Sequence, residues 1–173
     1  MRRADLLALA RSQKALPGSY RLGAGAPAGA ISAYDMSQAC DCSGFVCWAL
    51  GISRYQPELA FLKKALGHSW MNTDAIVADT LNPAGLFSVP ADPRPGDLLV
   101  YPSYAYARSS GLALTDKRGP KIGHVGIVTG TSSVIHCSSG NMNAHGRAIW
   151  ETDNEVFQRV PYTRIARYVG LED

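Results

Sequence analysis

The chain has 173 residues, of which 46% are hydrophobic and 18% charged, and its formal net charge is +3. This length is enough for one domain with a proper hydrophobic core, and we expect a single domain over residues 1–173. The small charge, without basic runs interleaved with aromatics, argues against nucleic-acid binding, and no apolar stretch approaches the length of a membrane span.

The N-terminal segment predicts a helix followed by a loop. Its apolar patch is too short for a signal-peptide core and lacks a convincing cleavage site, so no Sec signal is visible. Leu6, Leu9 and Ala10 instead share one face of an amphipathic helix. The Gly/Ala-rich residues 22–30 are typical of a loop.

The next segment places a cysteine at the start of a buried helix. Asp41-Cys42-Ser43-Gly44 runs into the apolar residues 45–50, and Gly51 is suited to end the helix. Unpaired N–H groups and the helix dipole favour negative charge at such a position, so we expect a lowered pKa for Cys42. With His124 and His136 on later strand-like segments, this pattern indicates a thiol nucleophile and its base.

The rest of the chain predicts two more helices and then a sheet. The helices are expected over 57–67 and 73–81, the second capped by Asn72 or Thr73. Strands are expected at 97–101, 124–129, 133–137, 148–150 and 165–169, with a hairpin between the second and third. Residues 102–121 are expected to form a long functional or disordered loop, and the polar Asn/Gly-rich segment around His145 is expected to be a loop as well. Helices followed by an antiparallel sheet predict an α+β domain.

The remaining cysteines favour a buried role rather than a metal site. Cys47 is expected to be a buried small hydrophobe, and Cys40 a spectator thiol or a redox partner of the nucleophile. Cys40-x-Cys42 running into a helix is a poor zinc knuckle, and no phosphate loop, dinucleotide or heme motif is present. We expect no metal and no organic cofactor.

Four sequence blocks together resemble the NlpC family of bacterial cell-wall cysteine peptidases. They are Asp41-Cys42-Ser43-Gly44-Phe45-Val46, Pro95-Gly96-Asp97-Leu98-Leu99, His124-Val125-Gly126-Ile127-Val128 and Ile135-His136. They occur in the family's order and span roughly the entire chain. The resemblance implies a single NlpC-type catalytic domain over 1–173. Its fold would be papain-like, with N-terminal helices packed on a small antiparallel β-sheet.

The resemblance also implies the catalytic roles. Cys42 would be the nucleophile, His124 the general base that later protonates the leaving amine, and His136 the polar residue that orients the base. The backbone N–H of Cys42 would form part of the oxyanion hole.

Three further residues are expected at the substrate side of the site. Tyr20, in Tyr20-Arg21-Leu22-Gly23, matches a family segment facing the cleft and is the candidate second donor to the oxyanion or substrate, with Tyr34 as its rival. Asp41 corresponds to the residue that can meet a free substrate amine, and Ser43 stands beside it. Asp97, after its Pro-Gly turn, is expected to be structural instead.

The implied activity is bacteriolytic hydrolysis of amide bonds in peptidoglycan stem peptides, of the γ-D-glutamyl-diamino acid endopeptidase type. The alternatives are an N-acetylmuramoyl-L-alanine amidase, an acyl transferase, or a catalytically silent cell-wall-binding module. The expected partner is peptidoglycan or its muropeptide fragments, and an immunity or delivery protein is left open. The site of action would be the cell wall, in the periplasm or outside the cell. Delivery would be by phage lysis or a secretion system, unless the chain is trimmed from a longer enzyme.

Overall fold

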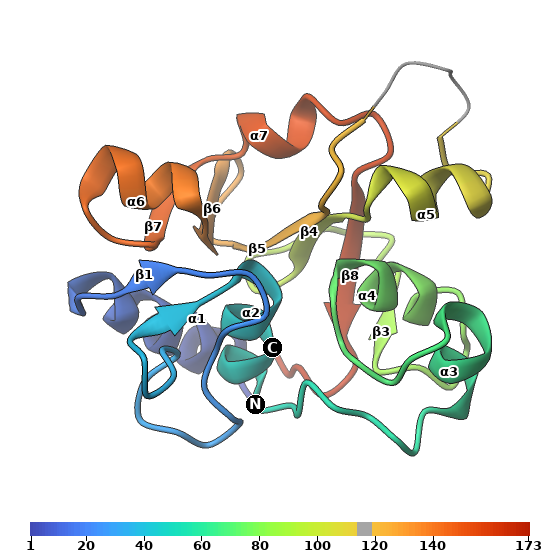
Figure 1. Cartoon of the computed structure of the whole chain (residues 1–173), viewed down its shortest axis with the longest axis horizontal. Coiled ribbons are helices and arrows are strands. Elements are labelled where there is room, and N and C mark those ends of the chain that lie inside the picture. The colour runs from blue at the N-terminus through green and yellow to red at the C-terminus, as the bar shows by residue number, and fades with distance from the viewer. Residues whose placement is uncertain (114–118) are drawn as a thin grey trace.

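The computed structural model describes residues 1–113 and 119–173, which form helices packed on an antiparallel sheet (Figure 1). The helices are α1 (Arg3–Ser12), α2 (Cys42–Leu50), α3 (Ala60–Leu66), α4 (Thr73–Asp79), α5 (Tyr104–Ser109), α6 (Ser139–His145) and α7 (Glu155–Gln158), with a 3-10 turn at Gln13–Ala15. The strands are β1 (Ser19–Tyr20), β2 (Ala39–Cys40), β3 (Phe87–Ser88), β4 (Leu98–Tyr101), β5 (His124–Val128), β6 (Ser133–Cys137), β7 (Ile149–Asp153) and β8 (Arg164–Tyr168). The expected α+β class is confirmed.

The main sheet has the order β3-β8-β4-β5-β6-β7, and every neighbouring pair is antiparallel. The hairpin of β5 and β6 pairs Ile127 with Ile135 and Val128 with Val134. Continuing this register places Gly126 opposite His136. A side chain on Gly126 would lie 2.9 Å from the Cβ of His136, so the glycine leaves room for the imidazole on this face of the sheet.

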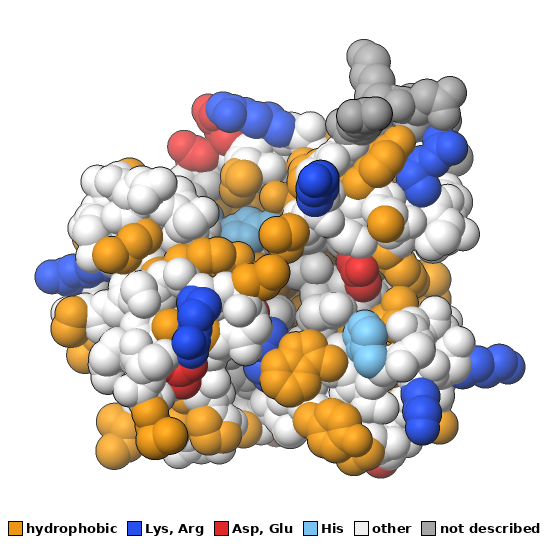
Figure 2. Space-filling view, in the orientation of Figure 1, with side chains coloured by type: hydrophobic (Ala, Val, Ile, Leu, Met, Phe, Trp, Pro, Cys, Tyr) orange, Lys and Arg blue, Asp and Glu red, His pale blue; other side chains and the backbone are white. Residues whose placement is uncertain are grey.

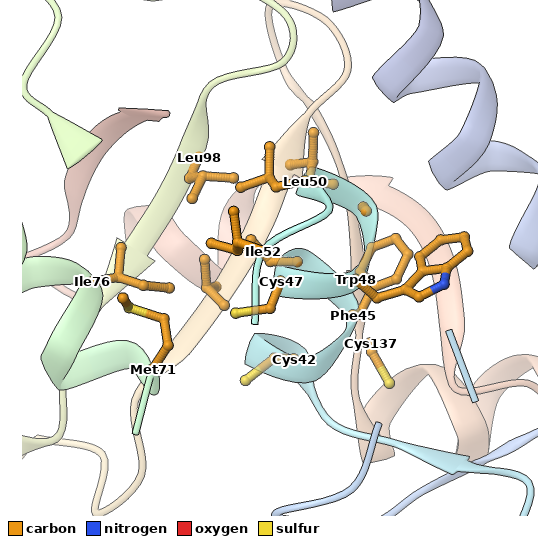
Figure 3. Packing of buried hydrophobic residues seen from close by; sticks show 14 of the residues in the cluster. Cys42, Phe45, Cys47, Trp48, Leu50, Ile52, Met71, Ile76, Leu98 and Cys137 are labelled. Carbon is orange, nitrogen blue, oxygen red and sulfur yellow. The ribbon is translucent and has the colours of Figure 1, made fainter. Parts of the chain in front are cut away.

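Helix α2 is the buried centre of the molecule. All nine of its residues are buried, because the helix is apolar on every side and packs on β5 and β6. Figure 3 shows Cys47 among Ile52, Met71 and Ile76, whereas Cys42 projects from the first turn. Gly51 ends the helix in the left-handed conformation, with φ 69°, as the sequence predicts.

Several expected elements are present with shifted ends. The two helices after α2 are shorter than expected, and Asn72 is the residue that caps α4, through its side chain and the N–H of Ala75. All five expected strands form. Asp97 has the expected structural role, because its carboxylate accepts from the N–H of Arg94 and pairs with Arg3 and Arg167.

Two expectations about loops were wrong. The segment 102–121 contains helix α5, capped by the Ser103 hydroxyl, while residues 114–118 lie outside the described part. The Asn/Gly-rich segment after β6, expected as a loop around His145, forms α6, because Ser138 caps its start and Gly146 ends it. The short parallel pairing of β1 with β2 was not expected either.

Among the described residues, no helix has the length and apolar character needed to cross a membrane.

Replacing Gly44 with alanine should destabilise the fold. The added Cβ would lie 2.4 Å from the Ala24 carbonyl oxygen and 2.9 Å from a guanidinium nitrogen of Arg54. We expect Gly44→Ala to lower the free energy of unfolding by about 1–3 kcal/mol, measured by urea denaturation. Gly140→Ala in α6 is the control, since its Cβ would meet nothing closer than 3.7 Å. Equal stability of the two variants would contradict the packing argument.

Candidate active site

The candidate nucleophile Cys42 lies in the first turn of α2 and is only 3% exposed. The backbone N–H groups of Val125 and Ser43 face its sulfur. Val125 directly follows His124, so packing of α2 on β5 brings the thiol to the end of the strand on which His124 lies. The structure records no hydrogen bond between the Cys42 thiol and the His124 ring. In unliganded sites such contacts are often long, and they tighten when substrate binds.

Asp41 holds the start of this helix. One carboxylate oxygen accepts from the Gly44 N–H at 2.6 Å and the Ser43 hydroxyl at 3.1 Å. The other accepts from the Gly23 N–H at 2.7 Å and from Arg54 at 3.1 Å. Asp41 is thus an N-cap and half of a buried ion pair. Four protein donors bind the carboxylate, which gives it a structural task. Asp41 also lines the cleft, and its expected contact with a substrate amine stays a prediction.

The two histidines form a hydrogen-bonded pair on one face of the sheet. Nε2 of His124 lies 2.7 Å from Nδ1 of His136, and the rings meet edge to face. The His124 ring also stacks on Phe157 of α7, with centroids 5.2 Å apart. This packing fixes the ring plane, and it leaves Nδ1 of His124 as the nitrogen not engaged by His136.

Burial keeps both histidines neutral. It lowers the pKa of His124 to about 3, with the neighbouring His136 adding to the effect. It also lowers the pKa of His136 to about 4, although the Asp153 carboxylate opposes the shift. Near neutral pH each ring therefore carries one proton, and His124 is available as a base.

The expected lowered pKa of Cys42 is wrong for this structure. Burial raises the pKa of its thiol to about 12, and the Asp41 carboxylate adds to the rise. The N–H groups of Val125 and Ser43 and the Arg54 guanidinium act in the other direction but are outweighed. The desolvation cost of a thiolate exceeds what the helix N-terminus provides. Near neutral pH the Cys42 thiol and the His124 imidazole are therefore both uncharged.

The structure distinguishes the two candidate tyrosines. Tyr20 on β1 is paired with Cys40 on β2, two residues before the nucleophile. Burial raises the pKa of its hydroxyl and the Cys42 sulfur contributes, so Tyr20 stays protonated as a donor close to the thiol. The hydroxyl of Tyr34 instead accepts from the N–H of Ile149 at 3.4 Å. Tyr20 is therefore the better-placed donor.

A cleft of about 280 Å³ opens beside Cys42. Figure 2 shows the surface hollowed between the side that carries β1 and α6 and the side that carries α3, α4 and α5. The residues lining the cleft are Leu22, Gly23, Asp41, Cys42, Ser43, Arg54, Trp70, Asn72, Thr73, Asp74, Ser103, Lys121, Ile122 and Gly123. The candidate nucleophile Cys42 is therefore at the wall of an open cleft, while most of α2 is buried in the core.

The other cysteines are buried free thiols. Cys137 on β6 donates to the carbonyl oxygen of Cys40 at 3.3 Å, and Cys40 donates to that of Asp41 at the same distance. Cys47 is fully buried within α2, as expected. Within the described residues, no group of three or more His, Cys, Asp or Glu side chains is arranged to hold a metal ion.

Comparison with known proteins yields structural matches only. No protein-family model and no curated protein matches the sequence. The structure is similar to solved NlpC/P60 domains. NlpC1 from Trichomonas vaginalis is 22% identical, with a TM-score of 0.48 over 94% of this chain and 42% of that one. The NlpC/p60 domain of the peptidoglycan hydrolase SagA is 17% identical, with a TM-score of 0.45 over 96% and 98%. An NLP/P60 lipoprotein-like protein from Staphylococcus aureus is 17% identical, with a TM-score of 0.49 over 99% and 42%. This chain thus spans less than half the length of NlpC1 and of the Staphylococcus aureus protein.

Sequence reasoning missed three residues of this candidate site. Arg54 binds Asp41 and Ser43, and its guanidinium lies over the Trp70 ring at 4.6 Å. Phe157 holds the His124 ring. Thr152 on β7 lies 3.1 Å from Nε2 of His136. None belongs to the four sequence blocks, and only the strand register places Thr152 near the histidines.

The neutral histidines predict a loss of stability in acid. Unfolding returns each ring to a pKa near 6.5, so below this value the unfolded chain binds protons that the folded chain cannot. Stability is therefore full above pH 6.5 and falls as pH drops toward 4. Between pH 7 and pH 5 each histidine should account for a loss on the order of 2 kcal/mol.

Urea unfolding at pH 5, 6 and 7 measures this loss, and His136→Gln should reduce it. His145→Gln, at an exposed position on α6, is the matched control. An equally steep decline in His136→Gln and in the unmodified protein would show that burial of the histidine pair does not cause it.

The raised pKa of Cys42 predicts a distinctive alkylation profile. Because the thiolate is the reactive form, the rate with iodoacetamide should climb about tenfold per pH unit from pH 7 to pH 9 without levelling off. Peptide mass spectrometry follows each cysteine, and Cys42 at the cleft should react faster than Cys47 inside the helix. A plateau near neutral pH would instead reveal a stable thiolate–imidazolium pair.

Proposed function

We propose that this chain is a cysteine hydrolase that cleaves amide bonds in peptidoglycan stem peptides, with Cys42 as nucleophile and His124 as base. The observation that carries the proposal is the position of Cys42. It lies at the wall of an open cleft and at the start of a buried helix, next to the strand that bears the His124–His136 pair. A structural cysteine of α2 would need none of these neighbours, as Cys47 illustrates.

The reaction starts from uncharged groups. A substrate carbonyl enters the cleft, Nδ1 of His124 takes the thiol proton, and the sulfur attacks the carbonyl carbon. Because the thiolate is costly in this buried site, proton transfer accompanies attack rather than preceding it. The oxyanion is stabilised by the backbone N–H of Cys42 and by the hydroxyl of Tyr20.

The reaction then proceeds through acylation and deacylation. The C–N bond breaks, the imidazolium of His124 returns its proton to the departing amine, and an acyl-enzyme remains on Cys42. Water then attacks the thioester carbonyl while His124 takes its proton, and cleavage of the C–S bond restores the thiol. His136 accepts a hydrogen bond from the His124 ring throughout and holds it in orientation. No step requires a metal or an organic cofactor.

The substrate class follows from the four NlpC-like sequence blocks. They favour the bond between γ-D-glutamyl and a diamino acid in a stem peptide, and hence action at the bacterial cell wall. Asp41 shapes the helix start in this mechanism, with Ser43 and Arg54 beside it. The exposed Lys121 at the cleft provides a cation for a substrate carboxylate.

Digestion of purified peptidoglycan tests the proposal. The protein should release dipeptide or tripeptide fragments detected by mass spectrometry, and Cys42→Ala should lower the rate by at least about a thousandfold. Cys47→Ala is the matched control, because it removes a buried thiol from the same helix and should leave the chemistry in place.

The fragments also separate the alternatives. Intact stem peptides freed from sugar would indicate an amidase, and newly joined peptides a transferase. Binding to peptidoglycan without any cleavage, by a protein whose fold is verified by circular dichroism, would contradict the hydrolase and favour a silent wall-binding module.

A further inference from the structure

Thr152 on β7 makes two short contacts that together define where its proton lies. Its Oγ1 is 2.7 Å from the carbonyl oxygen of Asp153 and 3.1 Å from Nε2 of His136. A carbonyl oxygen has no proton, so the hydroxyl proton must lie between Thr152 and Asp153. The hydroxyl therefore has no proton left for His136 and can only accept from it.

This assignment determines the tautomers of both histidines. With Thr152 as acceptor, the single proton of neutral His136 is on Nε2, and its Nδ1 carries a lone pair. The 2.7 Å contact between this Nδ1 and Nε2 of His124 then requires the proton to be on His124. Nδ1 of His124 is consequently unprotonated, which is the state a base needs.

We propose that Thr152 is a positioning residue that fixes both histidines in the tautomer leaving Nδ1 of His124 free to take the Cys42 proton. The catalytic consequence rests on the proposed hydrolase function, whereas the tautomers themselves do not. Without the threonine acceptor, His136 can carry its proton on Nδ1 and donate to Nε2 of His124. The remaining proton of His124 would then sit on Nδ1, and the base would be blocked.

The strand register of the sheet places the Thr152 hydroxyl beside His136. In the β6–β7 pairing, Val134 lies opposite Thr152 and His136 opposite Trp150, so Thr152 is a diagonal neighbour of His136 on the same face. His136 is in turn the diagonal neighbour of His124 across Gly126. Burial keeps the rings neutral by lowering the pKa values of both, and the Asp153 carboxylate opposes this shift at His136 without outweighing it. A neutral histidine pair can adopt alternative tautomers, and the Thr152 hydroxyl, as a fixed acceptor, determines which one forms.

The tautomers can be read directly by NMR. In protein labelled with ¹⁵N-histidine, protonated and unprotonated ring nitrogens have well-separated shifts, so the tautomer of each ring is observed without any substrate. At pH 7 we expect protons on Nε2 of both His124 and His136. Thr152→Val, which keeps the side-chain shape, should move protons to Nδ1, and Thr152→Ser should restore the original pattern.

Thr80→Val is the matched control, since it also removes a hydroxyl that donates to a carbonyl at 2.7 Å but lies at the end of α4. A proton on Nδ1 of His136 in the unmodified protein would overturn the proposal. So would tautomers in Thr152→Val that match those of the unmodified protein.

Activity on peptidoglycan provides the second readout. We expect Thr152→Val to lower kcat/KM about tenfold, the effect of losing one hydrogen bond, with Thr152→Ser and Thr80→Val near the unmodified value. Shifted tautomers with unchanged kcat/KM would overturn the catalytic part of the proposal. An unmodified protein that shows the expected tautomers but cleaves nothing would support the tautomer assignment and contradict the proposed function.

Discussion

Burial of α2 against β5 is the constraint on which the site depends. The helix is apolar on every side, so it is stable only when fully covered, and the sheet provides much of that cover. Asp41 caps its first turn, and the Asp41 carboxylate accepts hydrogen bonds from four donors. The outcome is a cysteine held at a fixed point between the core and the cleft. The position of the candidate nucleophile thus follows from helix packing and capping.

The same burial determines the charge states of the Cys42 thiol and the two histidine rings. A thiolate–imidazolium pair would require two charges in a site where the thiol is 3% and His124 8% exposed. Separating charge there is expensive unless a substrate supplies compensating donors and dipoles. The lowered pKa values of the histidines and the raised pKa of Cys42 therefore have the same cause, which is burial. In the proposed reaction, these groups stay uncharged until attack on the substrate requires them to ionise.

The sequence predicted those parts of the fold that local patterns control. The limits of α2 follow from Asp41, the apolar run and Gly51, and the hairpin of β5 and β6 follows from two short apolar runs around a turn. Helix α6 was missed because its Asn/Gly-rich composition is typical of a loop, and only the Ser138 cap and Gly146 indicate otherwise. The shift of the Cys42 pKa was predicted in the wrong direction, because the sequence reveals the helix start, whose dipole lowers the pKa. The depth of burial, which outweighs the dipole, depends on contacts far apart in the chain.

The candidate site shows the same division between local and long-range information. Cys42, His124 and His136 are visible as residue types in recognisable surroundings. Three other residues reach the site only through contacts formed in the tertiary structure: Arg54, Phe157 and Thr152. For Thr152 the controlling quantity is strand register, because a shift of one residue would turn the hydroxyl to the other face of the sheet. On the other side of β6, Gly126 leaves room for His136, since any side chain there would collide with His136 and Val134. In the proposed mechanism, Gly126 and Thr152 thus control whether His124 is free to act as the base, although neither takes part in the proton transfer.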